Sequence, residues 1–409
     1  MTNCLVCKNK IKPFISFGKQ PIANGFLTSQ EFQKEYFYNL AVGFCPICTM
    51  VQLTELVDRE KMFHTNYAFF SSTSRGMAKH FEEFAQFIKN KYLKNKHDPF
   101  VIEMGSNDGI MLRHFAKEEI NHLGIEPSKN VARVAMSNDI NTTTKFFDEE
   151  LAKEILSQYG QADAFLGANV MCHIPYIHSV IAGIKLLLKP KGVLVFEDPY
   201  VGDIVQKTSY DQIYDEHAFY FSVRSINNLM KMHKLEVIDV APQNTHGGSM
   251  RYTIGHIDTH KISPKVKKQL KIESALGLHR PKTYASLAKK INNSREGLIT
   301  LLKNLKKQGK RVVAYGATSK STTITNYCKI TPDLIEFISD TTPIKQGKYS
   351  PGTHIPVKAY EKFQNNHPDY ALLFAWNHAK EIMEKERQKN GYKGKWIVYI
   401  PKVKIIKSV

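Results

Sequence analysis

Apolar residues recur at helical spacing between Met77 and Lys89, and a short apolar run follows at residues 99–104. The first pattern predicts an amphipathic helix and the second a buried strand. Gly105 and Gly109 come next, ahead of another apolar stretch. We therefore expect the strand to pass through a glycine turn into the start of a helix.

Further apolar runs follow, separated by helical patterns. Residues 121–126 read as the second strand and residues 162–169 as the third, and residues 193–197 form another. Such alternation of strands and helices is typical of a parallel α/β sheet. A strand, a glycine turn and a helix start recur at residues 310–324, with a further strand at 335–340. The fold class is therefore α/β, with two Rossmann-like bodies.

The chain has 409 residues, which exceeds the size at which one hydrophobic core stops growing. We expect three domains, over residues 1–65, 66–265 and 266–409. No stretch approaches the roughly 18 uncharged apolar residues of a membrane span. The first residues also lack the basic region and apolar core of a signal peptide. These features predict a cytoplasmic protein without membrane contact.

The first glycine turn has the spacing G-x-x-x-G, which differs from the dinucleotide-binding fingerprint. Glu103, Asn107 and Asp108 surround Gly105 with carboxylate and amide oxygens. Such a loop would repel a pyrophosphate, but it suits the ammonium and sulfonium charges of S-adenosylmethionine. The loop therefore predicts a site for this methyl donor.

Two residues at the carboxyl ends of later strands extend this site. Glu126 ends the second strand, 21 residues after Gly105, where a carboxylate is expected to accept hydrogen bonds from ribose hydroxyls. Asn169 ends the next strand, and ligands gather at this edge of such sheets. Taken together, these elements predict a class I methyltransferase core.

Four of the six cysteines form two C-x-x-C pairs near the N-terminus. This pattern is a Cys4 zinc signature with a closed coordination sphere, so we expect a structural zinc ion. The alternative, a redox disulfide in each pair, is disfavoured for two pairs in a cytoplasmic chain. The predicted metal ligands are Cys4, Cys7, Cys45 and Cys48.

Tyr214, Asp215, Glu216 and His217 are consecutive and precede an aromatic run. Methyl transfer to a carbon next to a carbonyl needs a base that removes the α-proton. Histidine, with an unperturbed pKa of roughly 6.5, suits that task near neutrality. We expect His217 to be the base, with Glu216 fixing its tautomer or holding a substrate hydroxyl and Tyr214 orienting the substrate. An isolated histidine would more often be a helix cap or a core residue.

Several segments together resemble the nucleotide-deoxysugar C-methyltransferases of the 3-C-methyltransferase type along nearly the full chain. They are the cysteine pairs with residues 21–24 between them, residues 67–72, residues 103–109, residues 214–217, residues 246–251 and residues 316–320. The resemblance implies a structural zinc lobe, a middle domain that binds S-adenosylmethionine, and a C-terminal Rossmann-like domain that helps to hold a nucleoside-diphosphate 4-keto-6-deoxysugar.

The resemblance also implies roles for individual residues. His217 matches the base that removes the C3 proton, and His173 is a second candidate for proton handling or for holding the keto oxygen. Tyr214, Glu216 and Tyr67 match active-site positions, and Ser71 falls in a matched segment near the cofactor. The residues expected to bind the substrate are His246, Gly247, Ser249, Arg251, Lys320 and Asp340.

The second glycine loop carries Lys320 and hydroxyl groups where the first loop carries carboxylates. This chemistry favours an anion, so we expect the loop to hold the nucleotide diphosphate. The alternative is a structural domain whose loop binds nothing. Two segments depart from the family pattern. Ser319 and Ser321 flank Lys320 where the family has Ala-Lys-Gly, and Cys172 stands where the family usually has a small residue.

The formal charge is +19, and residues 260–409 carry the whole excess, with 30 Lys and Arg against 10 Asp and Glu. Aromatic residues are not interleaved with these charges as in proteins that bind single strands, so we expect no nucleic-acid partner. The competing functions are an O-methyltransferase acting on a sugar or polysaccharide precursor and a zinc-dependent nucleic-acid-binding module. The sequence does not predict the oligomeric state.

Overall fold

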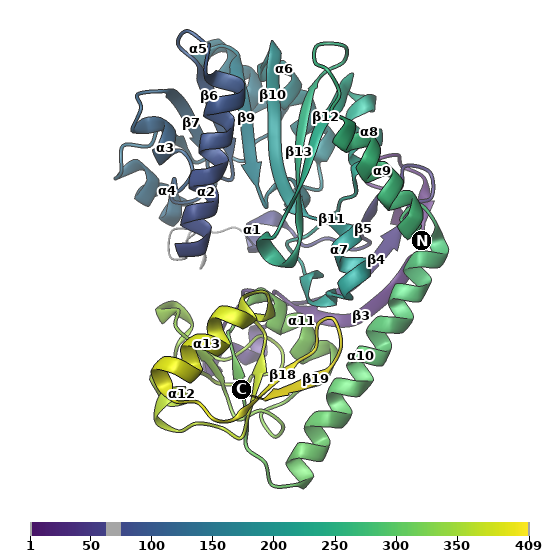
Figure 1. Cartoon of the computed structure of the whole chain (residues 1–409), viewed down its shortest axis with the longest axis vertical. Helices are drawn as coiled ribbons and strands as arrows, with labels where there is room; N and C mark the ends of the chain where they lie inside the picture. The colour runs from purple at the N-terminus through teal and green to yellow at the C-terminus, as the bar shows by residue number, and fades with distance from the viewer. Residues whose placement is uncertain (1, 63–74, 408–409) are drawn as a thin grey trace.

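The structure is a computed structural model that describes residues 2–62 and 75–407. The predicted site residues Tyr67 and Ser71 lie outside the described residues. Figure 1 shows one α/β body above another, with the N-terminal lobe beside both and the long helix α10 (Pro281–Lys307) running along the two.

The upper body is built on a seven-stranded sheet. Its five strands from β8 to β10 are parallel, and β13 inserts antiparallel between β10 and β12. In spatial order the strands are β12 (Leu235–Gln243), β13 (Ser249–His256), β10 (Leu188–Pro199), β9 (Ala162–Ala168), β6 (Phe100–Met104), β7 (Asn121–Ile125) and β8 (Thr142–Thr143). This arrangement confirms the predicted class I methyltransferase core.

Two details of the sequence prediction were wrong. The strand predicted as the third is β9, the fourth in chain order, because β8 has only two residues, too few to produce a hydrophobic pattern. The helix after the glycine turn begins only at Arg113, since residues 107–112 form turns, and it spans a single turn.

Helices cover both faces of this sheet. Val101 and Ile102 are neighbours on β6 but belong to different hydrophobic clusters, because successive side chains of a strand point to opposite faces. The helices are α2 (Arg75–Ile88), α3 (Arg113–Ala116), α4 (Lys129–Met136), α5 (Glu149–Tyr159), α6 (Ile177–Leu187), α7 (Val201–Lys207) and α8 (Val223–Met232). The predicted helix over 77–89 corresponds to α2, which buries Phe81, Phe84 and Ile88.

The N-terminal lobe shares a sheet with the upper body. Strand β11, from the segment after His217, pairs with β5, with Phe219 opposite Gln52, and so joins the lobe to a distant part of the chain. The lobe contains β1 (Thr2–Asn3), β2 (Lys10–Ile11), β3 (Pro13–Pro21), β4 (Phe37–Phe44), β5 (Val51–Leu53) and α1 (Arg59–Met62), and β11 spans Phe219–Tyr220. The lobe is therefore not an independent appendage.

The lower body has a six-stranded sheet in the order β16-β15-β14-β17-β18-β19, parallel except for β19. The strands are β14 (Val312–Tyr315), β15 (Ile338–Asp340), β16 (Val357–Ala359), β17 (Tyr370–Leu373), β18 (Lys395–Val398) and β19 (Lys404–Lys407). Its helices are α11 (Ser319–Tyr327), α12 (Glu361–Asn365) and α13 (Ala379–Asn390). The second Rossmann-like body is confirmed.

Helices α9 (Pro264–Leu276) and α10 connect the two bodies. Helix α9 packs on α8 and β12 of the upper body, whereas α10 contacts β3 of the lobe, α7 and β14. No helix in the part of the chain that the structure describes is long and apolar enough to cross a membrane.

Candidate active site

A glycine turn follows β6. Gly105 has a φ of +69°, and a Cβ at this position would lie 2.8 Å from a side-chain carbon of Val170. A side chain would therefore be strained by the backbone conformation and also by contact. The N–H of Gly105 donates to the carbonyl of Ile125 at 2.8 Å, which holds the turn against the end of β7.

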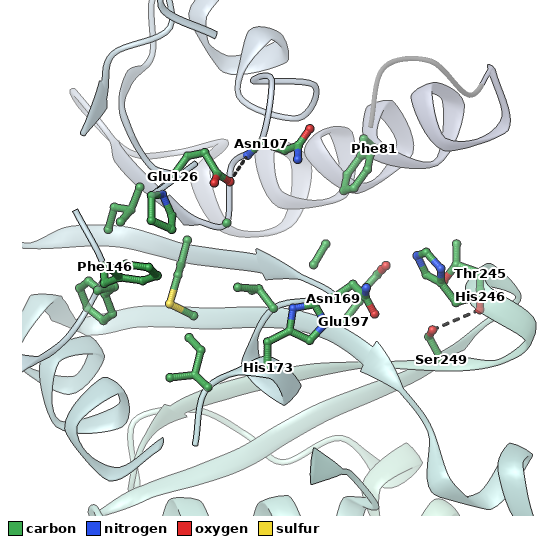
Figure 2. Close-up of a pocket in the computed structure, with 18 of the residues that line it drawn as sticks. Phe81, Asn107, Glu126, Phe146, Asn169, His173, Glu197, Thr245, His246 and Ser249 are labelled. Carbon is green, nitrogen blue, oxygen red and sulfur yellow. Dashed lines mark hydrogen bonds between the residues drawn. The ribbon is translucent and has the colours of Figure 1, made fainter. Parts of the chain in front are cut away.

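Glu126 directly follows β7 and points toward this turn (Figure 2). Its Oε2 accepts a hydrogen bond from the backbone N–H of Asn107 at 3.0 Å, and its Oε1 accepts one from that of Ser128 at 2.8 Å. These bonds fix the direction of the carboxylate and leave lone pairs for further donors. The geometry fits the predicted contact with ribose hydroxyls.

Other carboxyl groups crowd the same loop. Glu103 is buried at the end of β6, and burial together with the charges of Asp108 and Glu126 raises its pKa well above the usual range. Burial also raises the pKa of Glu126. Because the crowded acids repel one another when ionised, a cationic ligand is their natural complement.

A pocket opens from this loop, with about 1150 Å³ of empty space that includes its mouth. Figure 2 shows Glu126 and Phe146 at one end of it, Asn169 and His173 in the middle, and His246 and Ser249 at the other. Of the predicted cofactor residues that the structure describes, Gly105, Asn107, Glu126 and Asn169 line the pocket, whereas Glu103 and Asp108 are buried next to it.

Asn169 lies in the middle of the pocket, just after β9. Its backbone N–H donates to the carbonyl of Glu197 at 2.6 Å. Its side-chain Oδ1 is buried and has no hydrogen-bond partner among residues 2–62 and 75–407. A buried acceptor without a donor calls for a ligand, and the ammonium group of S-adenosylmethionine would supply one. The residues of the pocket therefore fit the predicted methyl donor.

The segment 214–217 lies in the interior, beyond His173. Among the described residues, His173 lines the pocket and Tyr214, Glu216 and His217 do not. The rings of His173 and His217 are stacked with centroids 5.2 Å apart, and the ring of Tyr214 lies 4.2 Å from that of His217. The structure thus brings together the rings of three residues predicted to act in catalysis, His173, Tyr214 and His217.

The tautomer of His217 follows from one contact. Its Nδ1 lies 2.9 Å from the backbone carbonyl of Gln212, which can only accept, so Nδ1 carries the proton. The Nε2 atom then presents a lone pair, is buried, and has no hydrogen-bond partner in the described part of the chain. Burial, with a further contribution from His173, lowers the pKa of His217 well below its usual value. The ring is therefore neutral at neutral pH and can accept a proton.

Burial also disfavours the charged forms of the neighbouring groups. It lowers the pKa of His173 to about 3. Burial and the charge of Glu216 raise the pKa of Asp215 to about 8, and burial raises that of Glu216. The segment is held in a low-dielectric environment, which strengthens each interaction it makes with a bound substrate.

The N-terminal lobe holds the two carboxyl groups of this segment. Oδ1 of Asp215 accepts a hydrogen bond from the backbone N–H of Ala23 at 2.9 Å, and Oε1 of Glu216 accepts one from Nδ2 of Asn24 at 2.8 Å. The lobe thus contributes directly to the order of the candidate active site.

The C-terminal body contacts the same elements from α11 (Figure 1). The hydroxyl of Thr322 donates to the carbonyl of Ala23 at 2.8 Å, and that of Thr323 donates to the carbonyl of Ile213 at 2.7 Å. Asp211 accepts hydrogen bonds from Nε1 of Trp376 at 2.5 Å and from the hydroxyl of Tyr399 at 2.8 Å. All three parts of the chain therefore meet around residues 211–217.

Two lysines of the C-terminal body reach this junction. Nζ of Lys320 donates to the carbonyl of His246 at 3.3 Å, and burial lowers the pKa of its ammonium against the opposing effect of Asp211. Nζ of Lys345 donates to the carbonyl of Ala317 at 2.9 Å. Burial also lowers the pKa of Lys345, which Asp340 and Glu216 oppose.

The remaining predicted substrate residues have varied surroundings. A Cβ on Gly247 would lie 2.4 Å from the ring of Trp376, so this glycine permits contact between the two bodies. Arg251 forms an ion pair with Glu197 at 2.5 Å. The hydroxyl of Ser249 donates to the carbonyl of Thr245 at 3.1 Å. Oδ2 of Asp340 accepts a hydrogen bond from the backbone N–H of Ala317 at 2.6 Å, and Oδ1 accepts one from that of Thr342 at 2.7 Å.

The four N-terminal cysteines converge as predicted. Sγ of Cys4 lies 3.5 Å from that of Cys48, and Sγ of Cys7 lies 3.4 Å from that of Cys45. All four sulfurs lie within 4.8 Å of one another. This compact all-sulfur set fits a tetrahedral zinc ion with no open position.

Sequence reasoning missed several residues of this site. Asn24 was noted only within a motif, and Lys345 only as part of a later loop, although both face Glu216. His80 was missed altogether, and its Nε2 lies 2.5 Å from Glu197 in the pocket wall. A polar residue within an otherwise apolar helix face was the available signal for His80.

Three family models match successive parts of the chain. They describe a zinc binding domain over residues 4–63, a methyltransferase domain over residues 76–240 and a C-methyltransferase C-terminal domain over residues 244–401. The chain is also 31% identical to the C-methyltransferase NovU of Streptomyces niveus over 398 residues, covering 96% of this chain and 94% of that protein.

Solved methyltransferase structures match part of the chain more weakly. One is a SAM-dependent methyltransferase from Anabaena variabilis, with a TM-score of 0.35 and 16% identity over 43% of this chain and 84% of that one. Another is magnesium protoporphyrin IX methyltransferase from Synechocystis with bound SAH, with a TM-score of 0.34 and 13% identity over 44% of this chain and 84% of that one.

Proposed function

The chain belongs to the C-methyltransferase family that includes NovU, and we propose that it methylates a carbon of a nucleoside-diphosphate 4-keto-6-deoxysugar. It is an S-adenosylmethionine-dependent methyltransferase with a zinc-binding lobe. The observation that carries the finer proposal is the buried Nε2 lone pair of His217, which has no hydrogen-bond partner among the described residues and belongs to a segment whose two carboxyl groups are held by the N-terminal lobe.

A carbon next to a carbonyl becomes nucleophilic when it loses its proton. Nε2 of His217 accepts this proton, while Nδ1 keeps its own proton on the carbonyl of Gln212. The ring then carries a positive charge, which the carbonyl of Gln212 stabilises through its hydrogen bond from Nδ1–H. S-adenosylmethionine supplies an electrophilic methyl group from its sulfonium.

The surrounding residues bind and orient the substrate. Glu216, held by Asn24, accepts a hydrogen bond from a sugar hydroxyl, and Tyr214 packs beside the base. His173 stands between the base and the pocket, where its ring faces the keto group. Lys320 and Lys345 offset the negative charge of the diphosphate.

Labelled substrate tests the proposal. A panel of nucleotide 4-keto-sugars assayed with labelled S-adenosylmethionine identifies the acceptor, and deuterium at the carbon next to the keto group reports on the position. Carbon methylation must release this deuterium to solvent. A methylated product that keeps the label would indicate O-methylation instead.

Replacement of His217 tests its role as the base. We expect His217→Asn to lower turnover by about 100-fold or more, within the usual range for general base catalysis, with S-adenosylmethionine affinity retained. His233→Asn serves as a matched control, since His233 lies away from the pocket and contacts His178. An unchanged rate in His217→Asn would assign proton removal to another group.

A further inference from the structure

A second cluster of metal-binding side chains lies under the pocket, apart from the four N-terminal cysteines. One ligand atom from each of Cys172, His173 and His217 lies within 4.8 Å of the others, and all three residues are buried. Cys172 and His173 belong to a 3₁₀ turn between β9 and α6, Met171–His173. His217 approaches from the segment before β11.

The donor set suits a borderline-soft divalent metal. One thiolate and two imidazoles are ligands that zinc and cobalt accept in tetrahedral sites, with metal–ligand distances of about 2.0–2.3 Å. Ligand atoms of such a site lie about 3–4 Å apart, so the three groups need only small movements to converge.

His217 is oriented as a metal ligand commonly is. Its Nδ1–H donates to the carbonyl of Gln212 at 2.9 Å, the contact that fixes the tautomer and aims the Nε2 lone pair. This Nε2 is buried and has no hydrogen-bond partner among the described residues. The ring is thus preorganised, and it lies in a site that also contains a thiol.

An ion can reach the cluster through the pocket, because His173 lines the pocket wall. Three protein ligands leave one coordination position for water or a substrate oxygen, in contrast to the closed set of four cysteines. Metal binding releases the thiol proton of Cys172 to solvent, so that the thiolate can coordinate.

We propose that Cys172, His173 and His217 form a reversible binding site for Zn²⁺ or a similar divalent metal, and that the bound metal inhibits the enzyme. Inhibition follows because a metal on Nε2 of His217 blocks the lone pair that accepts the substrate proton. This second part rests on the proposed function of His217, whereas binding of the metal does not.

Cobalt titration tests the binding. The full chain, with zinc in its four-cysteine site, is titrated with Co²⁺ and compared with Cys172→Ala and Cys328→Ala. Cys328 is a matched control, because it is a buried thiol outside the cluster. We expect a thiolate-to-cobalt charge-transfer band with one added equivalent in the wild type and Cys328→Ala, and none in Cys172→Ala. The same band in all three proteins, or in none, would overturn the proposal.

Zinc inhibition tests the consequence. Each variant's rate is measured with added Zn²⁺, relative to its own rate without it, and again after EDTA. We expect Cys172→Ala to need at least about tenfold more zinc for half inhibition than Cys328→Ala, in line with the usual cost of a disturbed metal site. If the wild type shows the cobalt band but zinc does not inhibit it, this result would contradict the role of His217 as base. It would still support the metal site.

Discussion

The two glycine loops of this chain share one hydrogen-bond pattern but carry opposite charges. In the first loop, Glu126 accepts from the N–H of Asn107 and from that of the residue two positions after itself. In the second, Asp340 accepts from the N–H of Ala317 at 2.6 Å and from that of Thr342, again two positions later, at 2.7 Å.

The side chains around these carboxylates differ. Glu103 and Asp108 lie beside the first loop, whereas Lys320 and Lys345 lie near the second. The backbone geometry is therefore a property of the strand–turn–helix unit, and under the proposed function the surrounding charges distinguish the ligands of the two loops. A cation suits the first loop and an anion suits the second.

Removing the carboxylate of the first loop should have the largest effect on this contrast. We expect Glu126→Ala to weaken S-adenosylmethionine binding by about 10- to 100-fold, because two ribose hydrogen bonds to a charged group are lost. Nucleotide-sugar binding should change little. Calorimetry with each ligand separately measures both effects, and equal losses for the two would show that the variant disturbs the whole fold.

Removing the cation of the second loop should weaken binding of the nucleotide-sugar and leave that of S-adenosylmethionine unchanged. We expect Lys320→Ala to raise the KM for the nucleotide-sugar by about tenfold, the value of one charged hydrogen bond, without changing S-adenosylmethionine affinity. Lys329→Ala is a control, because Lys329 follows the end of α11, beyond the loop. An unchanged KM in Lys320→Ala would leave the second loop without an anion role.

The two sites should also respond oppositely to pH. Burial raises the pKa of Glu126 above its usual value of 4.5, so this carboxylate takes up a proton at a higher pH than usual. S-adenosylmethionine affinity therefore falls as the solution becomes acidic. Burial lowers the pKa of Lys320 below 10.5, so nucleotide affinity falls as the solution becomes alkaline. Binding measured across pH for each ligand, with Glu126→Gln and Lys320→Met, checks the assignment. Parallel pH profiles would contradict it.

The smallest expected effect concerns Asn24, which lies outside both loops. Loss of its hydrogen bond to Glu216 in Asn24→Ala should lower kcat by about fivefold, equivalent to about 1 kcal/mol, and leave S-adenosylmethionine binding unchanged. Asn39→Ala is a control, since Asn39 bonds Glu55 on the exposed side of the lobe. A changed cofactor affinity would mean that Asn24 acts through the first loop instead.

Local patterns were sufficient to predict the strand, glycine turn and helix start that open each Rossmann-like body, together with β7, β9, β10 and β15. Gly105 and Glu126 are separated in the sequence by the length of one βαβ unit. The sequence alone therefore indicates that the two residues lie close together. Strand β8 escaped prediction because two residues form no periodic pattern.

Contacts between distant segments could not be predicted in the same way. Asn24 and Glu216 are separated by 192 residues, and nothing in either segment specifies the other. Lys345 approaches Glu216 only because the C-terminal body folds back along α10. Such contacts depend on how whole domains pack, which is determined by summed surfaces rather than by any local motif.

Ala23 is bonded from two sides, with its N–H donating to Asp215 and its carbonyl accepting from Thr322. This double contact limits how domains can be exchanged between this enzyme and its relatives. A chimera that exchanges the C-terminal body to obtain a new acceptor must also carry a matching surface on β3 and residues 23–24. The exchangeable unit for engineering is therefore the C-terminal body together with part of the zinc lobe, although the two are almost 300 residues apart in the chain.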